Sequence, residues 1–204
     1  MTKIKICGIT NYDDAAMAAD LGADAVGFIF ASSPRQTDPD NARKIIKRLP
    51  FFIKSVGVFV NEDIKKIIDI AEYCGLDNIQ LHGSESPEAC ELLMPRTIKA
   101  LRIKGYSTPE EYSCYTGRVR AFLLDTYSEN EAGGTGKTFN WDIAVNIKSL
   151  GVPIILAGGL NPGNIKEAID IVKPYAVDIG SGIEQRPGKK DHLLMRKLFE
   201  RIRD

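Results

Sequence analysis

The sequence predicts a closed (β/α)8 barrel, the TIM-barrel class, built as a single domain that covers residues 1–204. Eight short apolar segments alternate with eight segments of helical periodicity, and no linker rich in proline, glycine or serine divides them. Glycine-rich turns follow the last two apolar segments, where such barrels commonly hold a phosphate group. An open doubly wound sheet is the alternative, but it would usually carry fewer units and a nucleotide-binding glycine motif that this chain lacks.

The predicted strands are short runs of apolar and β-branched residues. They cover residues 4–9, 24–30, 53–60, 78–81, 97–103, 121–125, 153–157 and 176–179. Near-continuous apolar runs are expected here, because the strands of a parallel barrel are buried on both faces.

The predicted helices repeat apolar side chains every three or four residues, so that one face of each can pack on the strands. The first is rich in alanine and stops at Gly22, and Asn140 is placed to cap the sixth. The fifth is short and has the weakest periodicity. The helices cover residues 13–21, 40–49, 62–73, 86–93, 109–115, 141–150, 164–172 and 191–202.

Composition and charge argue against several classes of function. Lysine plus arginine equals aspartate plus glutamate, at 27 each, so no basic excess points to nucleic acid or to an anionic membrane. No apolar run approaches the ~20 residues that span a bilayer, and the chain starts without a signal-peptide pattern, so we expect a cytoplasmic protein. The four cysteines are far apart and form no cluster with histidine, which argues against a metal site and a disulfide framework. Composition leaves a monomer and a homodimer both open.

Active sites of these barrels lie at the carboxyl ends of the strands, and Cys7 ends the first strand. Alternation places Lys5 and Cys7 on the same face, about 7 Å apart along the strand. The lysine would favour the thiolate of Cys7. Two structural interpretations stay open: Cys7 as a buried apolar residue, and Lys5 as the partner of Asp178 in an ion pair inside the barrel, which we favour for the lysine.

Asp125 ends a strand that is otherwise wholly apolar, and a carboxylate there either caps a turn or belongs to the site. Partial burial would raise its pKa and let it donate a proton near neutral pH. The segment 126–140 that follows is long enough to be a lid. Its GGTGKT run fails both phosphate-loop patterns, since Glu131 and Phe139 stand where each pattern needs a glycine, and we interpret it as a flexible hinge.

Arg35 and His82 also follow predicted strands. Arg35 comes after a proline at the barrel mouth, where a guanidinium can bind a substrate carboxylate through two hydrogen bonds, although a surface arginine often has no such role. His82 could donate to a ligand or simply cap its strand. Cys74, Cys90 and Cys114 fall in or beside helices, and we interpret all three as structural.

The two glycine-rich turns near the end of the chain predict one phosphate held between them. Each turn follows a short apolar strand, and its small side chains leave backbone amides open to an anion. The first turn leads into a helix that we expect to open at Asn161. The residues concerned are Gly158, Gly159, Gly180, Ser181 and Gly182.

Short motifs spread in order over the whole chain carry a resemblance to a known family. They are KICGIT (5–10), GAD (22–24) with GF (27–28), SPR (33–35), VGVFV (56–60), QLHG (80–83), LDT (124–126), GGTG (133–136), LAGGL (156–160) and SGIE (181–184). Together they closely resemble the phosphoribosylanthranilate isomerases of tryptophan biosynthesis. LAGGL alone is shared by several phosphate-binding barrels, whereas the set is specific.

The resemblance implies a small-molecule substrate, N-(5-phosphoribosyl)anthranilate, and its Amadori rearrangement to 1-(2-carboxyphenylamino)-1-deoxyribulose 5-phosphate without a cofactor or a metal. Asp125 would be the general acid that protonates the furanose ring oxygen, and Cys7 the general base that takes the C2 proton. Arg35 would hold the anthranilate carboxylate and Asp178 would contact the ribose end, with His82 among the substrate-binding residues. The glycine-rich turns would hold the phosphate.

Two departures and two rival interpretations accompany the resemblance. The family often has serine where this chain has Gly180 and aspartate where it has Asn140; the first exchange keeps the amides and the second still caps a helix. The related isomerase of histidine biosynthesis acts on a substrate with two phosphates, and would favour an aspartate in place of Cys7 and a second phosphate site. A catalytically silent sugar-phosphate-binding barrel would not need both Cys7 and Asp125.

Overall fold

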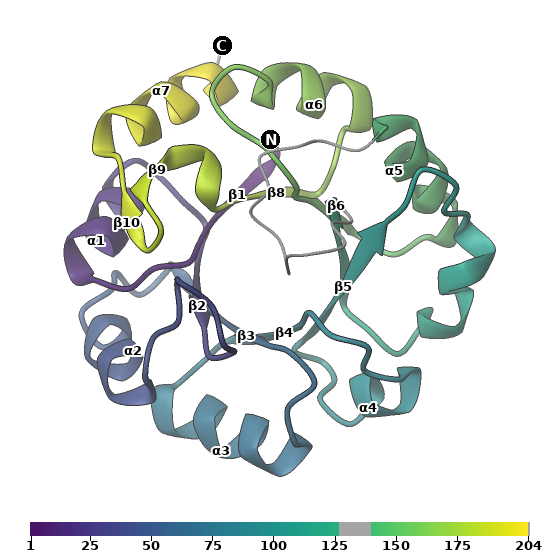
Figure 1. The fold of residues 1–204 in the computed structure, drawn as a ribbon, viewed down its shortest axis with the longest axis horizontal. Helices are drawn as coiled ribbons and strands as arrows, with labels where there is room; N and C mark the ends of the chain where they lie inside the picture. The colour runs from purple at the N-terminus through teal and green to yellow at the C-terminus, as the bar shows by residue number, and fades with distance from the viewer. Residues whose placement is uncertain (127–139, 204) are drawn as a thin grey trace.

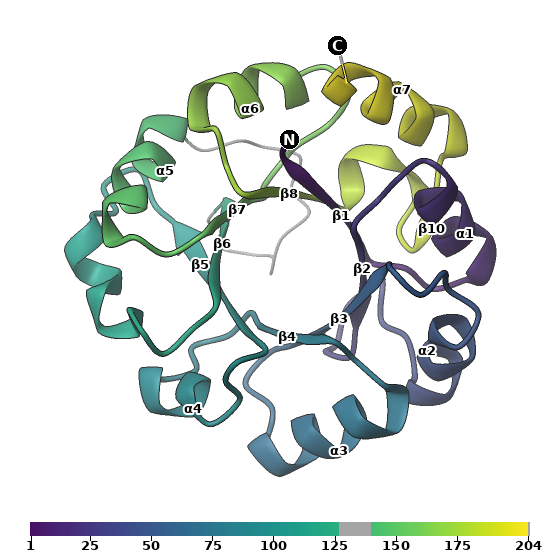
Figure 2. The same cartoon turned by 180° about the vertical axis from the view of Figure 1, so that it is seen from behind.

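The computed structural model describes residues 1–126 and 140–203, and it confirms the predicted barrel (Figures 1 and 2). Parallel strands close into a ring because the first strand pairs with the last as well as with the second, with Lys5 opposite Asp178. The strands are β1 (Lys3–Cys7), β2 (Ala25–Ile29), β3 (Lys54–Phe59), β4 (Asn78–Leu81), β5 (Thr97–Ile103), β6 (Ala121–Thr126), β7 (Ile154–Leu156) and β8 (Ala176–Ile179).

Helices surround the ring and begin where the sequence supplies caps. The side chains of Asn11, Asp38, Asp63, Ser86 and Asn140 each accept a hydrogen bond from an amide of the first turn. The helices are α1 (Tyr12–Asp20), α2 (Pro39–Ile46), α3 (Ile64–Cys74), α4 (Pro87–Glu91), α5 (Trp141–Ile147), α6 (Ile165–Val172) and α7 (His192–Arg203). The predicted helix at 109–115 is a 3-10 helix, η1 (Pro109–Tyr115), and the turn η2 (Lys148–Leu150) extends α5. Helix α6 begins at Ile165, one residue after the start of the predicted range 164–172, so Asn161 lies before the helix and does not open it.

Alternation along the strands separates two apolar layers. Outward-facing residues such as Ile6 and Phe122 pack against the helices in the main core, whereas inward-facing residues such as Val56 and Leu123 fill the barrel interior. The same alternation turns Cys7 inward, at the carboxyl end of its strand. The barrel interior therefore holds an apolar cluster and opens to polar groups at the carboxyl ends of the strands. No helix among the described residues is long and apolar enough to cross a membrane.

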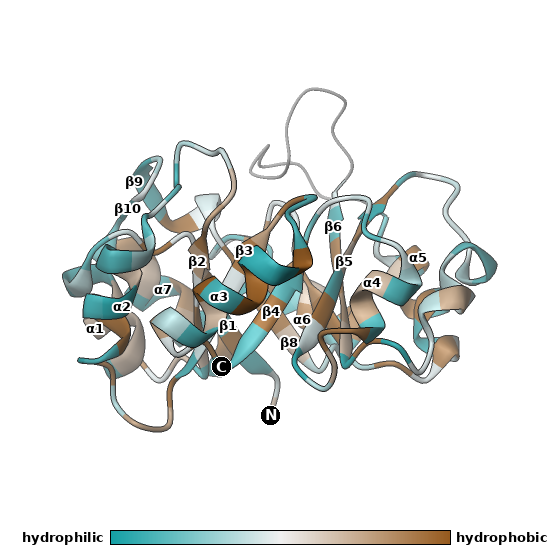
Figure 3. Cartoon of the chain, turned by 90° about the horizontal axis from the view of Figure 1, so that it is seen from below, coloured by the Kyte–Doolittle hydropathy of each residue, from teal (hydrophilic) through white to brown (hydrophobic). Residues whose placement is uncertain are grey.

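A small hairpin after β8 was not predicted. The chain makes a single 3-10 turn, η3 (Ser181–Ile183), then the antiparallel strands β9 (Glu184–Arg186) and β10 (Lys189–Lys190), and only then enters α7. Gly188 has φ +78°, a left-handed value that favours glycine in the tight turn between the two strands. The hairpin lies beside β1 and α1, at the same end of the barrel as the carboxyl end of β6 (Figures 1 and 3).

Candidate active site

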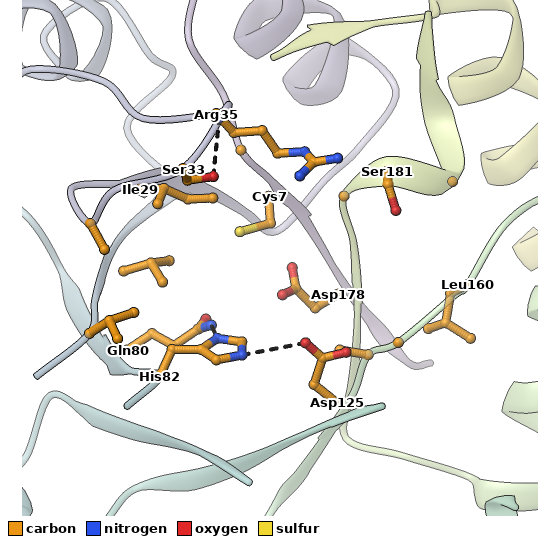
Figure 4. Close-up of a pocket in the computed structure, with 18 of the residues that line it drawn as sticks. Cys7, Ile29, Ser33, Arg35, Gln80, His82, Asp125, Leu160, Asp178 and Ser181 are labelled. Carbon is orange, nitrogen blue, oxygen red and sulfur yellow. Dashed lines mark hydrogen bonds and ion pairs between the residues drawn. The ribbon is translucent and has the colours of Figure 1, made fainter. Parts of the chain in front are cut away.

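A pocket opens at the carboxyl ends of the strands and brings together all of the site residues that the sequence predicts (Figure 4). The empty space at this mouth, open solvent included, is about 820 Å³. The predicted residues in its wall are Cys7, Arg35, His82, Asp125, Gly158, Gly159, Asp178, Gly180, Ser181 and Gly182. Residues from both ends of the chain therefore meet at one mouth because β8 closes on β1.

Cys7 is partly exposed in this pocket, next to a buried ion pair. Lys5 Nζ donates to Asp178 Oδ1 at 2.9 Å, which confirms the predicted pair inside the barrel. Cys7 Sγ and Lys5 Nζ both lie over Gly27, since a Cβ built there would sit 2.8 Å from the sulfur and 3.1 Å from the nitrogen. A larger residue at Gly27 would displace both groups.

Lys5 favours the thiolate of Cys7 as expected, but its effect does not decide the net pKa of the thiol. Burial raises the pKa of the Cys7 thiol above its ordinary value, and the negative charge of Asp178 raises it further. Lys5 and the more distant Lys190 act in the opposite direction, but they do not outweigh those two effects. Burial lowers the pKa of Lys5, but Asp178 and Cys7 together raise it above its usual range.

Asp125 lies across the pocket from Cys7, beside a pair of polar side chains from β4 and the loop after it. Asp125 is 7% exposed, and its Oδ1 accepts a hydrogen bond from Thr126 N at 2.8 Å. Its Oδ2 lies 3.4 Å from Nε2 of His82, close enough for an ion pair but outside hydrogen-bond geometry. Nδ1 of that ring lies 3.0 Å from Gln80 Nε2.

These contacts select one tautomer of His82. With the Gln80 amide oriented in this way, its nitrogen donates to Nδ1 of His82, which places the ring proton on Nε2. An Nε2–H group then faces Oδ2 of Asp125. Both Nε2 of His82 and Oε1 of Gln80 are buried without a hydrogen-bond partner among the described residues, and both residues line the pocket.

The two glycine-rich turns touch each other directly. Gly158 and Gly159 have φ values of +83° and +66°, a conformation that other residues rarely adopt. A Cβ on Gly182 would lie 1.9 Å from the carbonyl oxygen of Leu160, so only glycine lets the second turn approach the first. The turns therefore form one continuous wall of small residues, as a site for a single phosphate requires.

Arg35 reaches over the pocket mouth but already has a partner. Its Nε lies 3.0 Å from both carboxylate oxygens of Glu184, and its Nη2 lies 2.9 Å from Oε2. The side chain of Glu184 is 4% exposed and that of Arg35 is 16% exposed. Glu184 therefore occupies the Nε–Nη2 side of the guanidinium and leaves the Nη1–Nη2 edge for a ligand.

Three side chains at or beside the pocket were not among the predicted site residues: Gln80, Glu184 and Lys190. Gln80 could have been found from strand alternation, because it precedes His82 by two positions and so faces the same way. Glu184 and Lys190 lie on either side of the dipeptide Pro187–Gly188, a common turn signal, but nothing local indicates that both side chains would be buried.

Residues 127–139 of the predicted lid, with the GGTG run at 133–136, lie outside the described residues, and the lid stays a prediction. Within residues 1–126 and 140–203, no group of three or more histidine, cysteine, aspartate or glutamate side chains is arranged to hold a metal ion.

Known proteins resemble this chain over its full length. Residues 4–201 match the family model described as N-(5'phosphoribosyl)anthranilate (PRA) isomerase. N-(5'-phosphoribosyl)anthranilate isomerase from Geobacter sulfurreducens is 50% identical over 204 residues, which cover 100% of this chain and 99% of that protein. The crystal structure of phosphoribosyl anthranilate isomerase from Thermotoga maritima superposes with a TM-score of 0.92 at 42% identity, and covers 100% of this chain and 99% of its own.

Two further structures separate likeness of family from likeness of fold. A phosphoribosyl anthranilate isomerase in complex with reduced 1-(o-carboxyphenylamino)-1-deoxyribulose 5-phosphate is 40% identical with a TM-score of 0.89, and covers 100% of this chain and 99% of its own. A thiamine phosphate pyrophosphorylase from Pyrococcus furiosus reaches a TM-score of 0.69 at 13% identity over 98% and 95%, so the barrel alone is shared more widely. Because the match in sequence spans nearly the whole chain, this protein belongs to the N-(5'-phosphoribosyl)anthranilate isomerase family.

Proposed function

We propose that this chain catalyses the Amadori rearrangement of N-(5'-phosphoribosyl)anthranilate to 1-(2-carboxyphenylamino)-1-deoxyribulose 5-phosphate, a step of tryptophan biosynthesis. The observation that carries the proposal is the presence of Cys7 and Asp125 in one pocket, in a chain of this family. The solved relative in complex with the reduced product supports a substrate of the same class.

Asp125 is the general acid in this proposal. It protonates the furanose ring oxygen, the C1–O bond breaks, and the nitrogen lone pair forms the C=N bond of an open-chain Schiff base. The carboxylate left behind faces Nε2–H of His82, which favours its negative charge. Its position on β6, three strands from β1 around the ring, would put the acid and the base on two sides of a bound sugar (Figure 4).

Cys7 is the general base. Its thiolate takes the proton from C2, the C–H electrons form the C1=C2 bond, and the C=N electrons return to nitrogen, giving an enolamine that tautomerises to the ketone. The raised pKa of the thiol means that little thiolate is present at neutral pH, but each thiolate is a stronger proton acceptor. The proposed sequence consists of proton transfers and one C–O cleavage driven by protonation, with no net oxidation or reduction, so it calls for no cofactor.

The remaining pocket residues bind the substrate. Arg35 takes the anthranilate carboxylate, Asp178 lies near the ribose hydroxyls, and His82 contributes its Nε2–H. The two glycine-rich turns bind the phosphate through backbone amides. Together these groups account for both charged ends of the substrate.

The organisation of the protein is part of the same proposal. Residues 1–204 act as one catalytic domain, in the cytoplasm, on a small molecule, without nucleic acid or membrane. The Thermotoga maritima relative is described as dimeric, so of the two states left open by composition the homodimer is the one to test first. Sedimentation equilibrium over a range of protein concentrations distinguishes it from a monomer.

The direct test is the loss of anthranilate-type fluorescence when purified protein meets freshly generated phosphoribosylanthranilate. We expect rapid decay with the wild type. Cys7→Ala and Asp125→Asn should each lower kcat by about 10²–10⁴-fold while still binding inorganic phosphate. Folded protein that leaves the fluorescence unchanged would overturn the assignment.

A further inference from the structure

Three charged side chains form a cluster at the pocket wall: Glu184 and Lys190, which are buried, and Arg35, which is partly exposed. Glu184 Oε1 accepts from Lys190 Nζ at 2.9 Å, and the same carboxylate receives Arg35. The Lys190 side chain is 0% exposed. Because the cluster holds two cations and one anion, it lacks one negative charge, and Arg35 is the member that reaches the pocket.

Lys190 ties this cluster to the two ends of the proposed site. Its Nζ donates to the carbonyl oxygen of Cys7 at 2.6 Å and to that of Gly180 at 3.0 Å, as well as to Glu184. These three acceptors use all three N–H bonds of the ammonium. Lys190 therefore fixes Glu184 relative to the end of β1, where the base lies, and to the start of the second glycine-rich turn.

Glu184 determines which edge of Arg35 a ligand can reach. The carboxylate occupies the Nε and Nη2 side of the guanidinium, and no hydrogen bond or ion pair between described residues involves Nη1. A planar guanidinium can pair with a second carboxylate through its Nη1–Nη2 edge while the first holds the other side. Figure 4 shows this group extended across the mouth above Cys7.

We propose that Glu184 and Lys190 are positioning residues that hold Arg35 with its Nη1–Nη2 edge toward the carboxylate of the substrate. The inference rests on the proposed function, because that carboxylate is the anthranilate group of its substrate. The bound carboxylate completes the charge balance of the cluster. Glu184 then acts on substrate binding only through Arg35.

The test is a steady-state comparison of Glu184→Gln with the wild type, each also in an Arg35→Ala background. We expect Glu184→Gln to raise KM on the order of tenfold, since hydrogen bonds to charged groups are lost, with a much smaller change in kcat. In the Arg35→Ala background the same substitution should leave KM unchanged. The inhibition constant of inorganic phosphate should stay at the wild-type value, because the phosphate turns are untouched.

Glu85→Gln is the matched control. Glu85 is buried in a similar ion pair, 2.8 Å from Lys99 with side chains 5% and 3% exposed, and it does not line the pocket. The Glu85→Gln substitution should lower the free energy of unfolding and leave KM unchanged. If Glu184→Gln does not fold, Glu184→Asp keeps the charge that Lys190 needs and withdraws it from Arg35, so KM should again rise only when Arg35 is present.

Three outcomes count against the inference. An unchanged KM in a folded Glu184 variant would overturn it, as would an equal rise with and without Arg35, or a parallel loss of phosphate affinity. In each of these the wild type still turns over, so the proposed function stands. A wild type without turnover would overturn both.

Discussion

Replacing Lys5 with methionine should destabilise the barrel, because it leaves a carboxylate alone in the interior. Lys5 Nζ and Asp178 Oδ1 are 2.9 Å apart, and their side chains are only 4% and 8% exposed. Removing one partner of a buried ion pair costs about 3–5 kcal/mol. Methionine keeps most of the length of the lysine chain, so the loss comes from the charge rather than from a cavity.

The assay is urea unfolding at pH 7, followed by far-UV circular dichroism. Lys3→Met is the matched control, since Lys3 lies on the same strand and pairs with Asp24 at 2.7 Å, but with side chains 53% and 36% exposed. Its midpoint should move far less. The double variant Lys5→Met/Asp178→Asn removes the isolated charge and should recover part of the loss. Equal shifts for Lys3→Met and Lys5→Met, or no shift for the latter, would refute the reasoning.

The remaining predictions concern the base, the phosphate turns and the tautomer. The absorbance of the Cys7 thiolate can be measured at 240 nm as the difference between the wild type and Cys7→Ser during a pH titration. It should develop only above the pH range of an ordinary thiol, because folding raises the pKa of Cys7. Because the pKa of the Cys7 thiol is higher in the folded protein than in the unfolded chain, its contribution to the free energy of unfolding is fully present below the unfolded pKa. That contribution is lost as pH rises through the folded pKa. A thiolate already formed near pH 7 would contradict both expectations. Gly182→Ala should push the two glycine-rich turns apart at a cost of about 1–3 kcal/mol and weaken inhibition by inorganic phosphate, whereas Gly105→Ala, with no atom within 4 Å of the new Cβ, should leave the inhibition constant as it is. Gln80→Leu removes the donor to His82 Nδ1 and should lower kcat by up to about tenfold with KM little changed, since a neutral hydrogen bond contributes about 1 kcal/mol; an unaltered kcat would show that the tautomer does not matter.

The parts of the fold that the sequence predicts are those set by local rules. Period-2 alternation turns Cys7 and Asp125 inward, and caps such as Asn140 mark where helices begin. Barrel topology then brings the strand ends to one mouth without any knowledge of side-chain contacts. Residues whose place follows from strand position alone are therefore assigned to the pocket correctly.

The parts that the sequence does not predict depend on contacts between distant residues. Arg35 and Glu184 are 149 positions apart, and Lys190 and Cys7 are 183 apart, so no local pattern records either pair. The net pKa shift of Cys7 was missed for the same reason. Lys5 is visible two residues away, but burial and the charge of Asp178 exist only after the barrel has closed.

Chemical trapping tests the separate roles of Asp125 and Cys7 most directly. Borohydride added during the reaction reduces an open-chain Schiff base to a stable amine, which can be quantified by mass spectrometry against a protein-free control. The account predicts that Cys7→Ala, which keeps the acid and lacks the base, yields trapped amine well above the control, while Asp125→Asn yields no more than the control. Trapping in Asp125→Asn at the level of Cys7→Ala would contradict the assignment of Asp125 as the acid that opens the ring and Cys7 as the base that acts after it.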